Sequence, residues 1–174
     1  GASVDAAFGA RALFEADMLV RVSDARINQA KTAEQVLQYI DQVIPAIELP
    51  DLMVEAPGKL NGAGLAAINV AGRYFVAGTP IAVQRTPQFL DALANMKVLL
   101  LGDWQLLDTG HGRDVLEHPL NAVVWLAQDL KKQGLALSKG DLVSVGSFSK
   151  LLPSKAGLKV QAQYQGLPGN PTVS

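Results

Sequence analysis

The sequence predicts an α+β protein with a curled mixed sheet, and three observations lead to this fold class. Short segments rich in β-branched and aromatic residues recur along the chain, separated by turns that contain Gly, Pro or Asn. Only two or three segments have the apolar spacing of an amphipathic helix. With 49% apolar and 18% charged residues, the 174-residue chain is long and apolar enough to form one domain with a hydrophobic core.

Residues 14–22 are predicted to form the first strand, because they include aromatic and β-branched residues and no Gly or Pro. Side chains alternate between the two faces of a strand, so one face is apolar and the other carries Glu15 and Asp17. Two buried like charges are costly unless a cation neutralises them, and a divalent ion accepts carboxylate ligands. The alternative is a sheet edge where both acids face water and pair with Arg21 or another base.

The next segments are predicted to be a helix and a short strand. Residues 32–43 begin with a capping-box pattern and continue with apolar residues at helical spacing, which favours a helix. Pro45 would prevent the helix from continuing. Residues 46–49 then favour a short strand whose single acid, Glu48, needs a partner for the same reason as the acids of the first strand.

Two more helices and several short strands complete the prediction. One helix is expected over residues 87–94, and the clearest one begins at Pro119, with His118 at the N-cap position, and ends shortly before Gly134. Residues 109–114 are expected to be a glycine-rich loop. Further strands are predicted at residues 66–70, 74–77, 96–101, 104–108, 142–145 and 159–164, with a last one starting at residue 172.

Composition argues against several classes of partner and site. The net charge is -1 without any basic run, so no nucleic-acid partner is expected. The absence of cysteine excludes disulfides, thiolate metal sites and cysteine nucleophiles. No apolar run reaches the length of a membrane span and no signal peptide is visible, so no membrane partner and a cytoplasmic location are expected. Because the chain begins with Gly1 rather than Met, we expect upstream residues to have been removed or omitted; a leader among them would make the periplasm the alternative.

A long motif in the second half resembles a known family. It has the sequence His-Pro-Leu-Asn-Ala-Val-Val-Trp-Leu-Ala at residues 118–127, continues through residues 134–143 and includes Gly-Ser at 146–147. It closely resembles the 2-keto-4-pentenoate hydratase and 4-oxalocrotonate decarboxylase group of the fumarylacetoacetate hydrolase superfamily, and the resemblance extends over residues 8–173. It implies a mixed β-barrel or β-roll with a few flanking helices, one hydratase-like catalytic domain over residues 1–174, and Mg²⁺ or Mn²⁺ chemistry on small 2-keto acids.

The resemblance also implies a set of metal ligands. Members of the group have an E-x-E pair on one strand and a third acid on a later strand, and Glu15, Asp17 and Glu48 occupy these positions. Asp17 keeps the ligand chemistry of glutamate but shortens its reach by one methylene. Hydratase-like members tend to have Asp-Asn where this chain has Ile68 and Asn69, so the general acid or base is not accounted for.

Three other residues are candidates for contact with the substrate. His118 could act as an acid or base or contact the substrate, and the alternative is a helix cap. Asn69 could hydrogen-bond a substrate carboxylate or a metal-bound water, and the alternative is an ordinary strand-end amide. Ser147 matches the family's loop near the pocket, where the alternative is a role in the backbone turn.

Two functional hypotheses follow from the resemblance. The first is a metal-dependent lyase of aromatic catabolism, a hydratase of a 2-keto or 2-hydroxydienoate acid whose enolate the metal stabilises, with a decarboxylase or C–C hydrolase as close variants. The second is a non-catalytic member that keeps the fold as a binding or structural domain. The missing acid at Ile68, Asp17 in place of glutamate and the expected absence of the family's N-terminal segment favour the second. We also expect a homo-oligomer, and a separate polypeptide could supply that segment.

Overall fold

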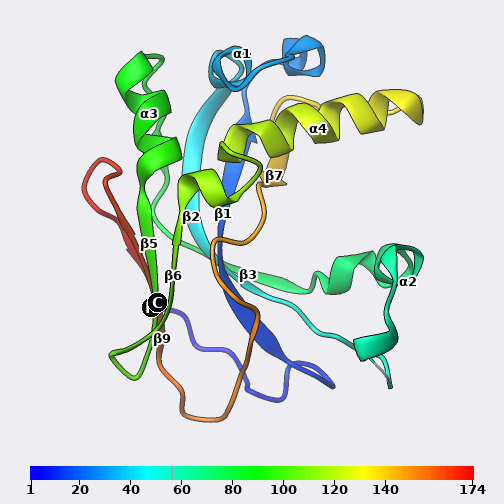
Figure 1. The fold of residues 1–174 in the computed structure, drawn as a ribbon, viewed down its shortest axis with the longest axis vertical. Helices are drawn as coiled ribbons and strands as arrows, with labels where there is room; N and C mark the ends of the chain where they lie inside the picture. Colours follow the sequence, from blue (N-terminus) through cyan, green and yellow to red (C-terminus); the bar gives the residue numbers. More distant parts are fainter. Residues whose placement is uncertain (56) are drawn as a thin grey trace.

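The computed structural model describes residues 1–55 and 57–174, which form two antiparallel sheets with helices gathered at one end (Figure 1). The helices α1, α3 and α4 lie together beyond the ends of the strands, whereas α2 lies apart from them (Figure 1). The helices are α1 (Ala33–Leu37), α2 (Gly62–Ala67), α3 (Pro87–Asn95) and α4 (Pro119–Lys132). Short 3₁₀ turns occur at Ala25–Gln29, Pro57–Lys59, Asn69–Ala71 and Gly112–Asp114.

Two long antiparallel strands form the centre of the first sheet, and four short strands pair with them. The strands of this sheet are β1 (Leu13–Val22), β2 (Ile40–Leu49), β3 (Tyr74–Ala77), β4 (Ile81–Ala82), β7 (Leu142–Ser144) and β8 (Leu152–Pro153). Both β3 and β4 pair with β2, while β7 and β8 pair with β1. This arrangement leaves β1 and β2 paired on both sides.

The second sheet has the strand order β10-β9-β5-β6. Its strands are β5 (Lys97–Gly102), β6 (Gln105–His111), β9 (Val160–Gln165) and β10 (Thr172–Val173). The two sheets do not close into a barrel within the described residues, so the barrel or roll remains a prediction, whereas the α+β class is confirmed. None of the described helices is long and apolar enough to cross a membrane.

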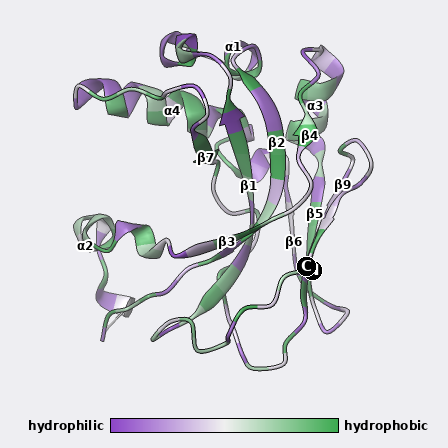
Figure 2. Cartoon of the chain, turned by 180° about the vertical axis from the view of Figure 1, so that it is seen from behind, coloured by the Kyte–Doolittle hydropathy of each residue, from purple (hydrophilic) through white to green (hydrophobic). Residues whose placement is uncertain are grey.

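The hydrophobic core lies between the two sheets and extends beneath the helices. The alternate residues of β1 predicted to form its apolar face are all at most 1% exposed: Phe14, Ala16, Met18, Val20 and Val22. They pack with residues of β5, β9 and α4 in one cluster. Figure 2 shows hydrophobic residues along β1 and β2 and an alternation of hydrophobic and hydrophilic turns along α4. The polar face of β1 is therefore turned away from this core.

Tyr164 of β9 joins the two sheets at the middle of β1. Its side chain is fully buried, and its hydroxyl oxygen lies 2.5 Å from the carbonyl oxygen of Asp17 and 2.6 Å from that of Ala46. The single hydroxyl proton is shared between these two acceptors, one on β1 and one on β2. Burial raises the pKa of the phenol, so it acts as a hydrogen-bond donor over the ordinary pH range. This contact links the second sheet to the backbone of β1 at Asp17.

The helix predicted over residues 32–43 is wrong in its second half. The capping residue is correct, since the Thr32 hydroxyl accepts a hydrogen bond from the amide of Gln35, but α1 ends at Leu37 and β2 begins at Ile40. Pairing along the whole of β1 outweighs the local helical spacing. Pro45 is tolerated inside β2 because its carbonyl faces Gly78, at the gap between β3 and β4, so its missing N–H faces no strand partner.

Two other sequence predictions need correction. Residues 66–70 were expected to be a strand but belong to α2 and the turn after it, because the Asn61 side chain caps the helix by accepting from Gly64. Residues 109–111 were expected in a loop but continue β6, whose last residue pairs with Lys97. The helices predicted at residues 87–94 and after His118 are confirmed.

Candidate functional site

Three carboxylates meet on one face of the sheet where β1 pairs with β2. Glu15 lies directly opposite Glu48 in the strand register, and Asp17 lies two residues further along β1, opposite Ala46. Directly opposite residues of an antiparallel pair have Cβ atoms about 4.5–5.5 Å apart and share a face. The structure therefore places Glu48 beside the acids whose common face the alternation of β1 predicts.

Burial and mutual repulsion make these carboxylates hard to ionise. Burial, followed by the charge of Asp17, raises the pKa of Glu48 to about 8. Burial also raises the pKa of Glu15 and that of Asp17, whose side chain is fully enclosed. Three acids with raised pKa values on one face resist ionising together, and no ion pair with a basic side chain of the described residues relieves this.

Asp17 is held in place by two donors. One carboxylate oxygen accepts the backbone N–H of Met18 at 2.5 Å, and the other accepts the hydroxyl of Ser144, on β7, at 2.6 Å. Both hydrogen bonds act to lower the pKa of Asp17, but burial has the larger effect and the net shift is upward. The donors fix the orientation of this carboxylate, which leaves its remaining lone pairs for another partner.

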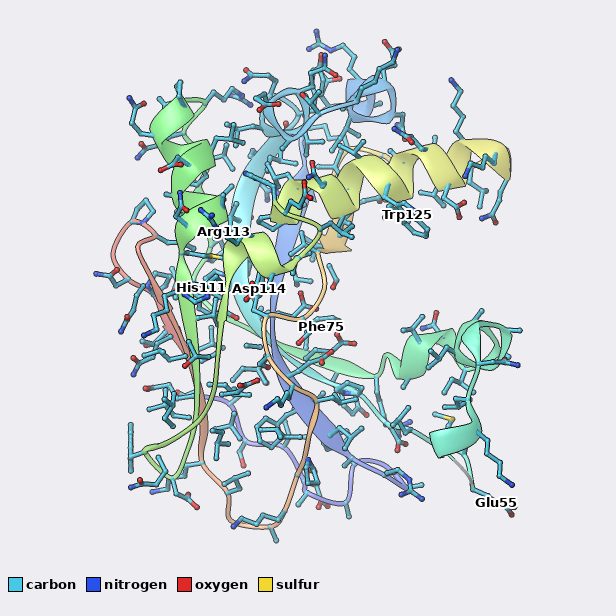
Figure 3. The ribbon with its side chains drawn as sticks, viewed as in Figure 1. Glu55, Phe75, His111, Arg113, Asp114 and Trp125 are labelled. Atoms are coloured by element: carbon cyan, nitrogen blue, oxygen red, sulfur yellow. The ribbon has the colours of Figure 1, made fainter. Side chains whose placement is uncertain are left out.

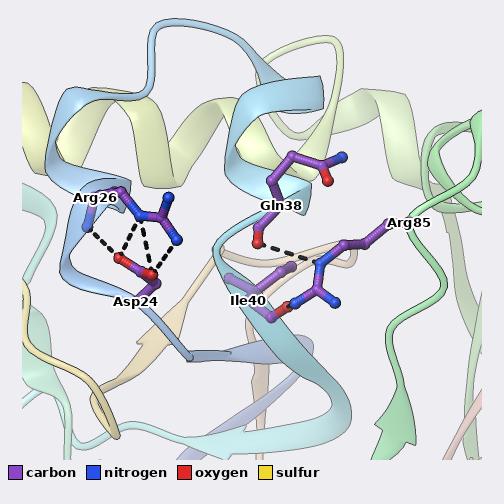
Figure 4. A network of polar contacts seen from close by, with 5 residues as sticks. All are labelled: Asp24, Arg26, Gln38, Ile40 and Arg85. Atoms are coloured by element: carbon purple, nitrogen blue, oxygen red, sulfur yellow. Dashed lines mark hydrogen bonds and ion pairs between the residues drawn. The ribbon is translucent and has the colours of Figure 1, made fainter.

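The basic side chains near β1 and β2 are used elsewhere. Arg21, the alternative partner proposed from the sequence, makes a two-pronged contact with Asp41 at 2.8 and 2.7 Å. Arg26 pairs with Asp24, and Arg85 donates to the carbonyl oxygens of Gln38 and Ile40 (Figure 4). In the described part of the chain, no lysine, arginine or histidine forms an ion pair with the three carboxylates.

The three carboxylates are suitable ligands for a divalent cation, although the side chains do not form a preformed metal site within the described residues. Carboxylate oxygens are the ligands that Mg²⁺ and Mn²⁺ prefer. Within residues 1–55 and 57–174, no group of three or more His, Asp or Glu side chains is drawn together tightly enough to enclose an ion. The strand register and the side-chain hydrogen bonds of Glu48 with Asp17 and Glu15 still bring the three acids together.

Asn69 lies next to this cluster. A Cβ atom at Gly72 would be 3.9 Å from Oε1 of Glu48 and 3.6 Å from Nδ2 of Asn69, so both side chains border the same glycine. Asn69, Val70 and Ala71 have φ values of 53°, 52° and 62°, a left-handed run that is costly for residues with a side chain. The turn that holds Asn69 beside Glu48 is therefore a strained one.

Ser147 also borders the cluster, next to Glu15, and this contact acts to lower the pKa of that acid. Its hydroxyl donates to the carbonyl oxygen of Ser149 at 2.7 Å and lies 3.3 Å from that of Ala16. The backbone-turn role considered as the alternative is thus present in the structure. Catalysis by Ser147 stays a prediction.

His118 belongs to the junction of α3 and α4. Its Nδ1 accepts the N–H of Leu120 at 3.1 Å, and its Nε2 lies 3.1 Å from the carbonyl oxygen of Leu90, which assigns the proton to Nε2. Burial lowers the pKa of His118, which favours the neutral ring. Both nitrogens are occupied by backbone partners rather than by the carboxylates, so a catalytic role for His118 stays a prediction that the helix-cap geometry does not favour.

Two neighbours of the acids escaped the sequence reasoning. Ser144 hydrogen-bonds Asp17, and Phe75 of β3 lies opposite Glu48 in the register of β2 and β3. Figure 3 labels Phe75 near the centre of the molecule, where β3 runs toward α2. The alternation of residues 74–77 predicts that Phe75 lies on the opposite face from Tyr74 and Val76. It does not predict that β3 pairs with β2, because this long-range pairing leaves no local signal in the sequence.

The sequence is similar to several proteins whose names state an enzymatic activity. No family model matches the sequence. A 2-keto-4-pentenoate hydratase of Paraburkholderia xenovorans (strain LB400) is 31% identical over 137 residues, which are 78% of this chain and 49% of that protein. A 4-oxalocrotonate decarboxylase of Pseudomonas sp. (strain CF600) is 29% identical over 133 residues, which are 76% of this chain and 48% of that protein. The chain is homologous to the 2-keto-4-pentenoate hydratase group.

The resemblance to the hydratase group inferred from the sequence is therefore confirmed. The chain spans about half the length of the curated hydratases and decarboxylases that it matches. A 4-oxalocrotonate decarboxylase from Pseudomonas putida G7, complexed with magnesium and adipate, superposes with a TM-score of 0.80 at 24% identity, over 94% of this chain and 59% of that one. A fumarylpyruvate hydrolase from Pseudomonas aeruginosa, in complex with Mn²⁺ and pyruvate, has a TM-score of 0.67 at 11% identity, over 95% and 66%. These two structures share the fold of this chain.

Proposed function

We propose that this chain carries the divalent-metal site of a lyase that acts on small 2-keto acids, a hydratase of a 2-keto or 2-hydroxydienoate acid. The observation that carries the proposal is the placement of Glu15, Asp17 and Glu48 on one face of paired strands without a basic partner among the described residues. The named activities of the homologues supply the reaction class. The mixed barrel or roll of the fumarylacetoacetate hydrolase type belongs to the same proposal.

Each residue of the cluster has a distinct role in this proposal. Glu15, Asp17 and Glu48 would hold Mg²⁺ or Mn²⁺, which would supply Lewis-acid chemistry when bound. Ser144 orients the carboxylate of Asp17 through its 2.6 Å hydrogen bond, which reduces the reorganisation needed to bind an ion. Asn69, at the rim beside Glu48, presents an amide that can donate to a substrate carboxylate.

The structural neighbours support a divalent cofactor, because several are complexed with magnesium, calcium or manganese. Among the described residues, no lysine or histidine forms an ion pair with the three carboxylates, so no such residue is assigned as the general acid or base. We also propose that the protein works as a homo-oligomer.

Two other functions are favoured by particular observations. A decarboxylase is favoured by the relative from Pseudomonas sp. (strain CF600). A non-catalytic binding domain is favoured by Ile68, which stands where hydratase-like members tend to have an acid, and by the contacts of His118, whose ring nitrogens both face backbone atoms.

A thermal-shift measurement with Mg²⁺ and with Mn²⁺ tests the metal site. The wild-type chain is expected to gain about 2.7 kcal/mol of stability at a metal concentration of about 100 Kd, because the ion binds only the folded state. The doubly substituted Glu15→Gln/Glu48→Gln chain should show no gain. Glu34→Gln is the matched control, since Glu34 is an exposed acid on α1, and it should respond as the wild type does.

The absence of any metal-dependent shift in the wild type would contradict the proposal. A positive shift is followed by an ultraviolet assay, in the presence of the metal, with a 2-hydroxydienoate and with a 2-hydroxydienedioate, whose second carboxylate can leave as CO₂. Loss of the dienoate chromophore without release of CO₂ supports a hydratase, whereas CO₂ release supports the decarboxylase. Metal binding with neither reaction favours the binding domain.

A further inference from the structure

Phe75 stands in one row with two of the acids. It is opposite Glu48 in the pairing of β3 with β2, and Glu48 is opposite Glu15 in the pairing of β2 with β1. Register partners point to the same face of a sheet, so the aromatic ring and the two carboxylates lie side by side across three strands. The ring forms the apolar edge of an otherwise acidic surface.

The hydrophobic core does not account for this side chain. Along β3, Val76 packs against the core, and Tyr74 makes an edge-to-face contact with Phe8 at 5.9 Å between ring centroids. Both lie on the other face from Phe75, as the alternation of the strand requires. Phe75 remains 39% exposed and has no ring partner within the described residues. A large apolar side chain left partly exposed beside half-buried acids is available to a ligand.

The polar groups of the site lie close to Glu48 and Glu15. The amide of Asn69 borders Glu48 through Gly72, and Asp17 is held next to Glu15 on β1. A ligand that binds here meets acids and an amide at one end and a ring at the other. A 2-keto acid has a matching division, because its carboxylate and keto oxygens are polar and its carbon chain is not.

We propose that Phe75 is a specificity-determining residue that contacts the carbon chain of the 2-keto acid beyond its third carbon. The proposal rests on the function proposed above, because it needs the carboxylate and keto oxygens to be held at the acid cluster. We therefore expect this chain to prefer 2-keto acids with an apolar or unsaturated tail. Short acids such as pyruvate, and acids with a charged group on the fourth carbon, should bind less well.

Calorimetric titration of the 174-residue chain with two ligands, in saturating Mn²⁺, tests this assignment. Pyruvate probes the polar end alone, and 2-oxohexanoate adds a saturated tail. Wild type should prefer 2-oxohexanoate. Phe75→Ala should weaken 2-oxohexanoate about tenfold, the effect of losing apolar contact with about two methylenes, and change pyruvate less than twofold. Phe75→Leu should lie between the two proteins.

Tyr74→Ala is the matched control, because it removes an aromatic residue from the same strand on the opposite face. It should leave the ratio of the two affinities unchanged, and the melting temperature of each variant shows that it is folded. Equal losses for both ligands in Phe75→Ala and Phe75→Leu, or no loss, would overturn the role of Phe75. Wild type that binds pyruvate without preferring 2-oxohexanoate overturns this inference alone. Wild type that binds neither ligand overturns the proposed function and this inference with it.

Discussion

The two ends of the β1–β2 pair treat their acids in opposite ways. At the end near the helices, Asp41 pairs with Arg21 and Asp24 pairs with Arg26, and these partners lower the pKa of Asp41 and bring that of Asp24 to about 2. Toward the other end of the same strands, burial raises the pKa of Glu48 to about 8, and no basic side chain of the described residues forms an ion pair with it. The first arrangement neutralises charge within the chain. The second leaves acids that would ionise more readily beside a bound cation, and strongly shifted pKa values of this kind are typical of a functional site.

The largest expected effect comes from removing the support behind the acid cluster. Tyr164→Phe deletes the hydroxyl that lies against the carbonyl oxygens of Asp17 and Ala46. These buried acceptors lose their donor, so the free energy of unfolding should fall by about 1–3 kcal/mol in urea denaturation. Tyr39→Phe is the control, since its hydroxyl makes no hydrogen bond with the described residues. Equal stability of the two variants would show that Tyr164 acts through its ring alone.

A smaller effect is expected from pH. Native Glu48 keeps its proton up to a pKa of about 8, whereas the unfolded chain releases it near 4.5, so the folded state binds more protons between these values. The contribution of Glu48 to the stability of the metal-free chain should therefore be greatest below pH 4.5 and fall as the pH rises from 4.5 to about 8. The loss should be on the order of 1 kcal/mol, since water screens this half-buried group.

Glu48→Gln should flatten this pH dependence, as measured by the melting temperature between pH 5 and 9 in the presence of a chelator. Addition of Mn²⁺ to the wild type should reverse its slope, because the ligands must be deprotonated to bind. The acids of the ion-paired end behave in the opposite sense, since the lowered pKa of Asp24 means that its contribution is lost only as the pH falls toward 2. A wild-type stability that rises from pH 5 to 8 without metal would contradict the raised pKa of Glu48.

The smallest effect should come from the ion-paired end. Arg21 and Asp41 are both partly exposed, with 40% and 37% of their side-chain surface accessible, and exposed pairs add little to stability. Arg21→Gln and Asp41→Asn should each lower the melting temperature less than Tyr164→Phe does. Neither should change the response to Mn²⁺. A changed metal response would mean that the two ends are coupled, and the comparison between them would fail.

The sequence predicts the common face of the acids better than it predicts the elements around them. The alternation of β1 is strict, so the common face of Glu15 and Asp17 follows from period two alone. The helical spacing after Thr32 is misleading, because Ile40 and Val43 are apolar for their buried places in β2 rather than for a helix face. The neighbours Ser144 and Phe75 come from strands far along the chain, and only the register of the sheet places them beside the acids.

Pro45 has a consequence for motion as well as for pairing. Because a proline stands where β2 passes from β3 to β4, the ladder on that side is interrupted, and the amide of Gly78 makes the link at the gap. The strand that carries Phe75 can therefore open as a unit without disturbing β4. We expect the amides of β3 to exchange with deuterium sooner than the amides hydrogen-bonded between β1 and β2. The side of the site that carries Phe75 would then open more often than the side that carries Glu15 and Asp17.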